Sequence, residues 1–253
     1  MKHTALDTLN PVTRLVLCFI ATTPLIVTLD WLSASVALAS QVVVLRACGV
    51  SLRFMATHLL PVLVAAPIAA ISMALYGRPG GRIWVDFGLL VVSDQSLMLA
   101  LAVFIRIFAL TLPVLVLLSG VDPTLMGDGL AQIVRLPAKL VLGSLAGVRM
   151  IGLFVSDWQT LARARRARGL GDQGRFKRWF TMAFAMLVFA IRRGSVLATA
   201  MEARGFGDAT ERTWARPSVL TWRDPVAFLV VISTVTLALG SAIWFGTIWY
   251  VWT

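Results

Sequence analysis

Two short stretches of this sequence are near copies of each other. RARGLGD covers residues 166–172 and EARGFGD covers residues 202–208, and both contain Ala-Arg-Gly, one apolar residue and Gly-Asp. An arginine guanidinium is a planar donor that binds a carboxylate through two parallel hydrogen bonds, so these residues offer recognition rather than catalysis. The duplication predicts two similar acidic, hydrogen-bonding pockets on a pair of related partner subunits.

Each Ala-Arg-Gly triplet closes a long predicted helix, and the triplets begin 36 residues apart, at positions 167 and 203. Glycine directly after a helix adopts a left-handed conformation that other residues resist, so Gly169 and Gly205 are predicted to cap these helices. Arg168 and Arg204 then lie at the last turns, where a cation complements the carbonyl-rich helix end. The simpler interpretation is that both motifs are ordinary helix stops, because arginine and glycine are favoured there; the duplication favours docking.

The residues beside the two arginines indicate how such a helix end would fit a partner. Ala167 and Ala203 are small and would let the helix end enter a narrow groove. Asp172 and Asp208 repeat as well and are predicted to cap or brace the following turn. The arginines just before the first triplet would steer docking toward an acidic surface, or would simply be cytoplasmic charge near anionic lipid. The secondary docking candidates are Arg163, Arg165, Arg166 and Glu202.

The composition places these motifs in a membrane protein. Hydrophobic residues make up 58% of the 253 residues and charged residues 14%, whereas soluble domains average about 45–50% and about 25%. The mean hydropathy is +0.85. Between Leu161 and Arg223 the chain carries thirteen basic residues and four acidic ones. Because loops rich in lysine and arginine stay on the cytoplasmic side, this block is predicted to be cytoplasmic.

Five apolar stretches come close to or exceed the length of about 20 helical residues that crosses the hydrocarbon layer. The predicted fold is an all-α polytopic protein of the inner (cytoplasmic) membrane with about five transmembrane helices. The first stretch is interpreted as a retained span rather than a cleaved signal peptide. Four spans return the chain to its starting side, so we expect a cytoplasmic N-terminus and an external Thr253. The stretches are 12–29, 31–45, 52–76, 95–119 and 226–251.

The predicted organisation has three parts. Residues 1–120 hold the N-terminal transmembrane helices, residues 121–223 form a cytoplasmic coupling-helix domain with both Ala-Arg-Gly motifs, and residues 224–253 form the C-terminal transmembrane helix. The coupling domain is expected to contain a short helix capped by Asp122, then two long amphipathic helices that end near Arg168 and Arg204. The alternative is that 138–157 and 179–197 are two further membrane spans.

Several stretches together resemble one protein family, the transmembrane T component of energy-coupling factor transporters. The resemblance covers most of the chain and is weakest from about 30 to 118. It rests on NPVTR at 10–14, SGVDPTLMGDGL from 119, RLPAKLVLGSLAGVRMIGLF from 135, LARARRARG, AMEARGFG and the Arg212-Thr213 pair.

The resemblance implies a coupling subunit. In that family two arginine-bearing helix ends seat in grooves of two cytoplasmic ABC ATPase subunits, and a separate small membrane protein, the S component, captures the substrate. We therefore expect this chain to transmit ATP-driven motions to an S component for vitamin uptake. Cobalt or nickel uptake is the alternative, because this subunit need not touch the substrate.

Other functional classes lack their motifs. The sequence has no phosphate-binding G-x-x-x-x-G-K-[ST] loop, so ATP hydrolysis is expected in partner subunits and the chain is not expected to be an enzyme. It also has no protease or hydrolase signature, which disfavours an intramembrane hydrolase. Nucleic-acid binding is disfavoured because Phe176 and Trp179 do not alternate with the basic residues as a stacking platform would. Neither cofactor nor metal is expected, since Cys18, Cys48, His3 and His58 lack ligand spacing.

One charged residue lies inside a predicted span. Arg106 occupies the fourth apolar stretch, where ionisable side chains are costly and face the protein interior. It would either contact the substrate subunit or act as a hinge, or it would pair structurally with an acidic residue such as Asp30 or Asp94.

Overall fold

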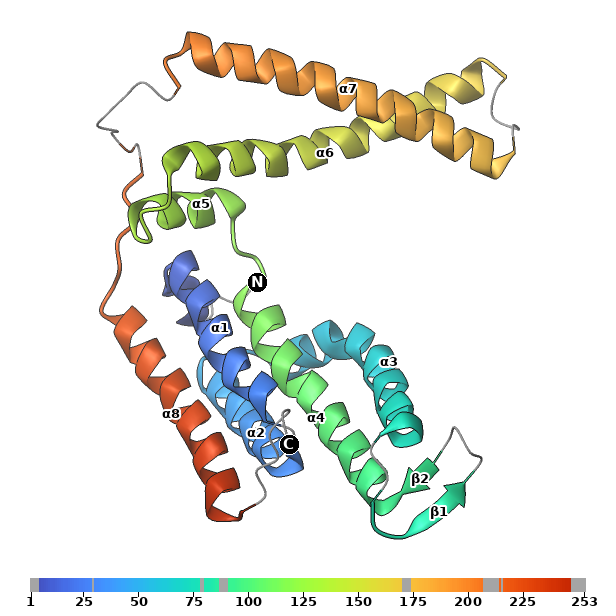
Figure 1. The fold of residues 1–253 in the computed structure, drawn as a ribbon. Helices are drawn as coiled ribbons and strands as arrows, with labels where there is room; N and C mark the ends of the chain where they lie inside the picture. The colour runs from blue at the N-terminus through green and yellow to red at the C-terminus, as the bar shows by residue number, and fades with distance from the viewer. Residues whose placement is uncertain are drawn as a thin grey trace. The chain divides into compact units, whose positions relative to one another are not determined.

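The computed structural model describes residues 5–28, 30–77, 80–86, 91–169, 174–206, 214 and 216–246 (Figure 1). Helices dominate, which confirms the predicted all-α fold. They are η1 (Ala5–Thr8), α1 (Pro11–Val27), α2 (Trp31–Ala47), α3 (Leu52–Tyr76), α4 (Asp94–Leu117), α5 (Pro123–Gln132), α6 (Ala138–Ala167), α7 (Arg175–Ala203) and α8 (Arg223–Trp244). Asp172, Asp208, Arg212, Thr213, His3 and Thr253 lie outside the described residues.

A short antiparallel hairpin between α3 and α4 was not expected from the sequence. It consists of β1 (Ile83–Asp86) and β2 (Val91–Ser93), with Val85 opposite Val92. Asp94, the first residue of α4, accepts a hydrogen bond from the Trp84 indole at 2.6 Å. Asp94 was one of the two acidic residues predicted to pair with Arg106, and its carboxylate bonds to the hairpin.

The chain divides into two compact units. The first comprises Met1–Val121 and Val219–Thr253, and the second comprises Asp122–Ser218. The first unit, here called the membrane unit, is a bundle of α1, α2, α3, α4 and α8. The second, here called the coupling unit, contains α5, α6 and α7.

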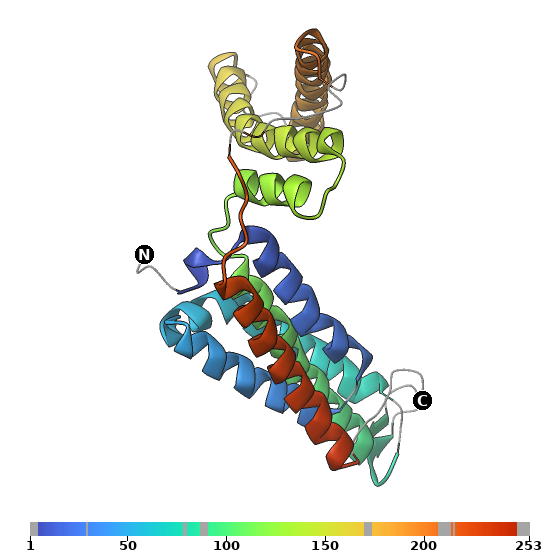
Figure 2. The same ribbon diagram turned by 90° about the vertical axis from the view of Figure 1, so that its left-hand side faces the viewer.

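Within the membrane unit, α4 is the central helix and packs against α1, α2 and α3, while α8 lies against α1 and α2 (Figure 2). Asp224 attaches the start of α8 to the start of α1. Its carboxylate accepts hydrogen bonds from the backbone N–H groups of Asn10, at 3.0 Å, and Thr221, at 2.6 Å. Asp224 is 1% exposed. A buried carboxylate with these bonds keeps its polar atoms satisfied.

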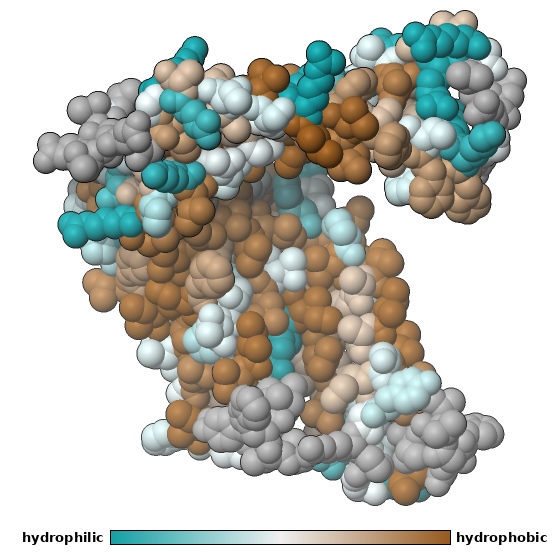
Figure 3. Space-filling model, turned by 45° about the horizontal axis from the view of Figure 1, so that its top comes forward, coloured by the Kyte–Doolittle hydropathy of each residue, from teal (hydrophilic) through white to brown (hydrophobic). Residues whose placement is uncertain are grey.

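The outer faces of the membrane unit are apolar. On α3, Leu60, Val64 and Ile68 follow one another at four-residue spacing and are all exposed, and Figure 3 shows hydrophobic residues over much of the surface of the bundle. Helices with apolar residues on their outer faces are stable where lipid replaces water. The chain is accordingly a multi-pass membrane protein.

Among the residues that the structure describes, five helices have the length and composition of a membrane span, but they are not the five spans predicted from the sequence. Helices α3, α4 and α8 agree with the prediction and have mean hydropathies of 2.1 to 2.5. Helices α6 and α7 also qualify, at 1.7 and 1.5. Helices α1 and α2 have only 17 residues each. Length and composition therefore admit both the predicted arrangement and the alternative in which α6 and α7 cross the membrane.

The coupling unit begins with α5, whose start is capped as predicted. The Asp122 carboxylate accepts the Thr124 N–H at 2.8 Å. At the other end of α5, Gln132 donates to the Arg216 carbonyl at 2.9 Å and accepts from the Ser218 N–H at 2.8 Å. Residues 216–218, at the end of the coupling unit, are thus hydrogen-bonded to α5, its first helix.

Arg106 is buried within the membrane unit, as its apolar context predicted. It is 7% exposed, and its Nε and one terminal nitrogen have no hydrogen-bond partner among the described residues. It interacts electrostatically with Asp30, whose carboxylate also caps α2 through the Ser33 N–H at 2.8 Å. Of the two predicted acidic partners, Asp30 is therefore the one whose charge acts on Arg106, although no hydrogen bond joins the two side chains among the described residues.

Candidate docking site at two helix ends

Helix α6 ends at the first Ala-Arg-Gly motif. Ala167 is its last residue, and Arg168 follows with φ −87° and ψ 9°. Gly169 has a φ of +72°, and its N–H donates to the Arg166 carbonyl at 3.0 Å. This is the left-handed glycine cap that the sequence predicted.

Helix α7 ends in the same way at the second motif. Arg204 has φ −93° and ψ 12°, and Gly205 again has a φ of +72°. The Gly205 N–H donates to the Glu202 carbonyl at 2.9 Å, and the Phe206 N–H donates to the Met201 carbonyl at 3.0 Å. These two bonds form the Schellman pattern of helix termination. The two predicted glycine caps are confirmed, and the two arginines share one backbone conformation.

All six residues of the two triplets are exposed: Ala167, Arg168, Gly169, Ala203, Arg204 and Gly205. Neither motif guanidinium forms a hydrogen bond or ion pair with any residue that the structure describes. Each helix end therefore presents an unused cationic donor beside a small residue. This arrangement can bind an acidic groove, and it is also compatible with a plain helix stop.

The secondary docking candidates lie differently. The Nε of Arg163 donates to the Gln159 carbonyl at 3.3 Å, and the Nε of Arg166 donates to the Ala162 carbonyl at 3.4 Å. Arg165 is half-buried. Glu202 is exposed in the last turn of α7. Arg163 and Arg166 thus bond to carbonyl groups of α6 itself, whereas the Arg168 guanidinium forms no such bond with the described residues.

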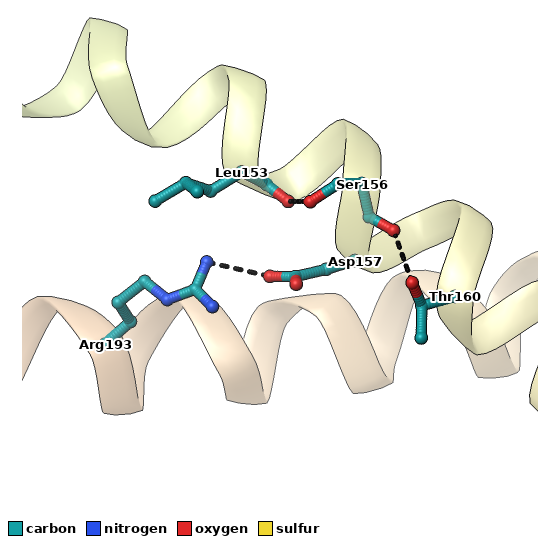
Figure 4. Close-up of polar contacts among 5 residues, drawn as sticks. All are labelled: Leu153, Ser156, Asp157, Thr160 and Arg193. Carbon is teal, nitrogen blue, oxygen red and sulfur yellow. Dashed lines mark hydrogen bonds and ion pairs between the residues drawn. The ribbon is translucent and has the colours of Figure 1, made fainter.

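The contact that joins the two long helices was not predicted from the sequence. Helices α6 and α7 cross, and at the crossing Arg193 donates to the Asp157 carboxylate at 2.7 Å (Figure 4). The guanidinium also lies 5.9 Å from the centre of the Phe154 ring. The sequence does contain a signal for this contact, because Asp157 and Arg193 are 36 residues apart, as are the two triplets.

Hydroxyl groups near the crossing are satisfied within α6. Ser156 donates to the Leu153 carbonyl at 2.8 Å, and Thr160 donates to the Ser156 carbonyl at 2.9 Å (Figure 4). These bonds stay within one helix, so they do not connect α6 to α7. Asp157 is therefore the side chain in this view that links α6 to its neighbour through a polar contact.

An apolar groove follows the crossing between the two helices. The α6 side contributes Phe154 and Trp158, and the α7 side contributes Met186 and Leu187. Nearer the start of α7, Phe180 and Phe184 are also exposed. This surface suits an apolar partner or the membrane boundary.

The sequence model of the family described as CbiQ, cobalt transport protein, matches residues 2–214, a range that contains both helix ends. The chain belongs to the CbiQ family. A member of this family is a component of a membrane transporter rather than an enzyme.

Several curated proteins are similar to this CbiQ family member, and each is described as energy-coupling factor transporter transmembrane protein EcfT. The protein of Limosilactobacillus fermentum is 27% identical over 176 residues, which are 64% of this chain and 65% of the relative, just under two thirds. The protein of Macrococcus caseolyticus is 23% identical over 245 residues, 91% of each chain. That of Listeria innocua is 26% identical over 206 residues, 77% of each. Together with the family match, these relatives show that the chain is a transmembrane T component of an energy-coupling factor transporter.

Proposed function

We propose that this chain couples two cytoplasmic ABC ATPase subunits to a small substrate-binding S component for vitamin uptake. Arg168 and Arg204 would each seat in an acidic groove of one ATPase. The chain itself would hydrolyse no ATP, because its sequence lacks a phosphate-binding loop.

This proposal rests on the close similarity in backbone conformation between the two helix ends. The backbone angles of Arg168 and Arg204 differ by only a few degrees, both glycines have a φ of +72°, and both guanidiniums are exposed. One structure presented twice fits a pair of homologous subunits better than it fits two unrelated ones. If each motif only ended its helix, the residues that flank Ala-Arg-Gly would not need to be the same at both ends.

The long helices explain how motion would pass from the ATPases into the membrane. The two motif ends lie at opposite ends of the crossed pair α6 and α7 (Figure 1). A helix transmits displacement along its axis because its backbone hydrogen bonds are internal. Movement of the two ATPases would therefore change the angle at the crossing, and the apolar groove beside Phe154 and Met186 would carry that change to the S component.

The orientation is part of the same proposal. The coupling unit carries both motifs and most of the basic block, so it would lie on the cytoplasmic side, with the N-terminus on that side too. The bilayer would contact the apolar faces of α3, α4 and α8, and nucleic acid would not be a partner.

Uptake of cobalt or nickel is the second candidate function. It is favoured by one observation, the description of the matching family as a cobalt transport protein. The similar proteins named above carry no substrate in their descriptions.

The test is reconstitution of the purified complex. The chain is co-expressed with its candidate ATPases and S component, purified through a tag on the chain, and placed in proteoliposomes containing ATP. We expect two ATPase subunits to co-purify and uptake of a radiolabelled vitamin to require ATP. Uptake of cobalt or nickel instead would favour the second candidate, and uptake by the chain without ATPases would contradict both.

A further inference from the structure

The membrane unit contains an apolar pocket beneath the first half of α8. Its volume is about 370 Å³, and its walls come from η1, α1, α2, α4 and α8. Leu17, Ala21 and Leu117 line it and are themselves buried, so they form its base. The pocket is therefore part of the bundle and is distinct from the helix ends proposed to bind ATPases.

The rim of this pocket is amphipathic. Trp222, which is 71% exposed, and Arg223 line it where α8 begins, and the Arg223 guanidinium lies 5.7 Å from the centre of the Trp222 ring. The end of α2 lines the same region through Leu45 and Cys48. An aromatic ring beside an arginine is typical of the boundary between hydrocarbon and headgroups.

The surroundings indicate what fills the pocket. An empty apolar cavity forfeits dispersion contacts with its lining, and apolar cavities do not hold water. A cavity of about 150 Å³ accommodates benzene, so this volume suits a chain of about 15 carbon atoms. A helix is about 10 Å wide and would not enter. In a bilayer, the apolar chains available in excess are those of phospholipids.

We propose that this pocket binds one acyl chain of a phospholipid whose phosphate pairs with Arg223. The exposed guanidinium supplies the charge that complements the phosphate, and the Trp222 ring lies at headgroup depth beside it. The acyl chain fills the space between α8 and the α1–α2 pair, so the lipid completes the packing of α8. With the orientation proposed above, this lipid belongs to the cytoplasmic leaflet; the pocket itself does not depend on that orientation.

The experiment counts bound lipid on the purified, delipidated full-length chain. Phosphatidylglycerol is titrated in detergent and detected by native mass spectrometry. In a Cys18→Ala background, alkylation of Cys48 by a maleimide reports on the same pocket, which Cys48 lines. We expect one tightly retained lipid, and we expect its addition to slow alkylation at least several-fold.

Two kinds of variant test the assignment. Ala227→Phe fills the pocket and should abolish both retention and protection, whereas Arg223→Gln should weaken retention about tenfold. Ile232→Phe and Arg53→Gln are matched controls, because both residues are exposed and neither lines the pocket. If Ala227→Phe fails to fold, Ala21→Leu fills the same pocket from α1.

The outcomes separate the possible occupants. Loss of retention in the pocket variants but not in the controls supports the proposal. The proposal is overturned if all variants retain lipid equally, or if Arg53→Gln loses as much lipid as Arg223→Gln. Either result means that lipid binds only to the outer surface. Protection of Cys48 without added lipid means that the protein fills its own pocket, which also overturns it.

Discussion

Asp157 on α6 and Arg193 on α7 form an ion pair of 2.7 Å, and each precedes its motif arginine by eleven residues. The contact therefore joins equivalent positions of two similar segments. Eleven helical residues span about 16 Å, so Arg168 and Arg204 stand at equal distances along their helices from this pair. The ion pair is well placed to set how the two helix ends diverge.

Reversing one charge of this pair should broaden the separation of the two helix ends. Asp157→Arg places two cations at the crossing, whereas the swap Asp157→Arg/Arg193→Asp restores attraction. Because the two side chains are 27% and 38% exposed, the cost in stability should be only about 1 kcal/mol or less. The measurement is the spin-label distance between cysteines at Ala164 and Ala200, without the native cysteines. Identical distance distributions in all variants would show that apolar packing alone sets the crossing.

Replacing both motif arginines should abolish transport without preventing membrane insertion. Arg168→Glu/Arg204→Glu puts like charges together in the proposed acidic grooves, at a cost of about 2–5 kcal/mol for each broken pair. Arg→Lys should be milder, because it keeps the charge but loses the planar fork. The readouts are cellular uptake at equal membrane amounts and recovery of ATPases in pull-downs.

The control for that experiment is substitution of Arg163 and Arg165, which lie back from the tip of α6 and should matter less. Normal uptake and normal ATPase recovery in the double glutamate variant would establish that the motifs are only helix stops.

The capping glycines should resist substitution even though space is available. A Cβ at Gly169 or Gly205 would meet no atom within 4 Å, so the penalty of Gly→Ala comes only from the left-handed backbone, about 1–2 kcal/mol. Gly152→Ala is the matched control, because that position is helical and equally open, and alanine should stabilise it by up to about 1 kcal/mol. Thermal unfolding in detergent compares them. Equal melting temperatures would mean that the helix ends relax at no cost.

Cysteine labelling should place the middle of α6 and α7 in the cytoplasm. Cysteines at the exposed residues Ser156 and Ser195 should be protected from an impermeant thiol reagent in intact cells and should react after permeabilisation. Arg82→Cys, directly before β1, should react in intact cells, because the segment between α3 and α4 is expected on the external side. Protection of positions 156 and 195 under both conditions would instead indicate that α6 and α7 cross the bilayer.

Arg106 and Asp30 should show coupled stabilities. Arg106→Met alone leaves a buried carboxylate without its cation, whereas adding Asp30→Asn removes that charge too. The double variant should therefore be more stable than the sum of the single effects predicts, by about 1 kcal/mol. A double-mutant cycle from thermal unfolding gives this value. Strict additivity would assign Arg106 to a partner other than Asp30.

The sequence alone determined the helix ends and the nature of the protein. Gly169 and Gly205 stop their helices through hydrogen bonds to residues three positions back, and Asp122 caps α5 through a residue two positions ahead. Such bonds depend on neighbours in the chain, so a short motif suffices to predict them. The apolar composition likewise identifies a membrane protein without knowledge of the fold.

Only the tertiary structure decided which distant residues meet. The bond from Asn10 to Asp224 spans 214 positions, and the contact of Asp157 with Arg193 depends on where two helices cross. The lipid-sized pocket exists because α8 does not fill the space above Leu17 and Leu117. Helix packing is set by the fit of many side chains along each face, and no single short stretch of sequence contains that fit.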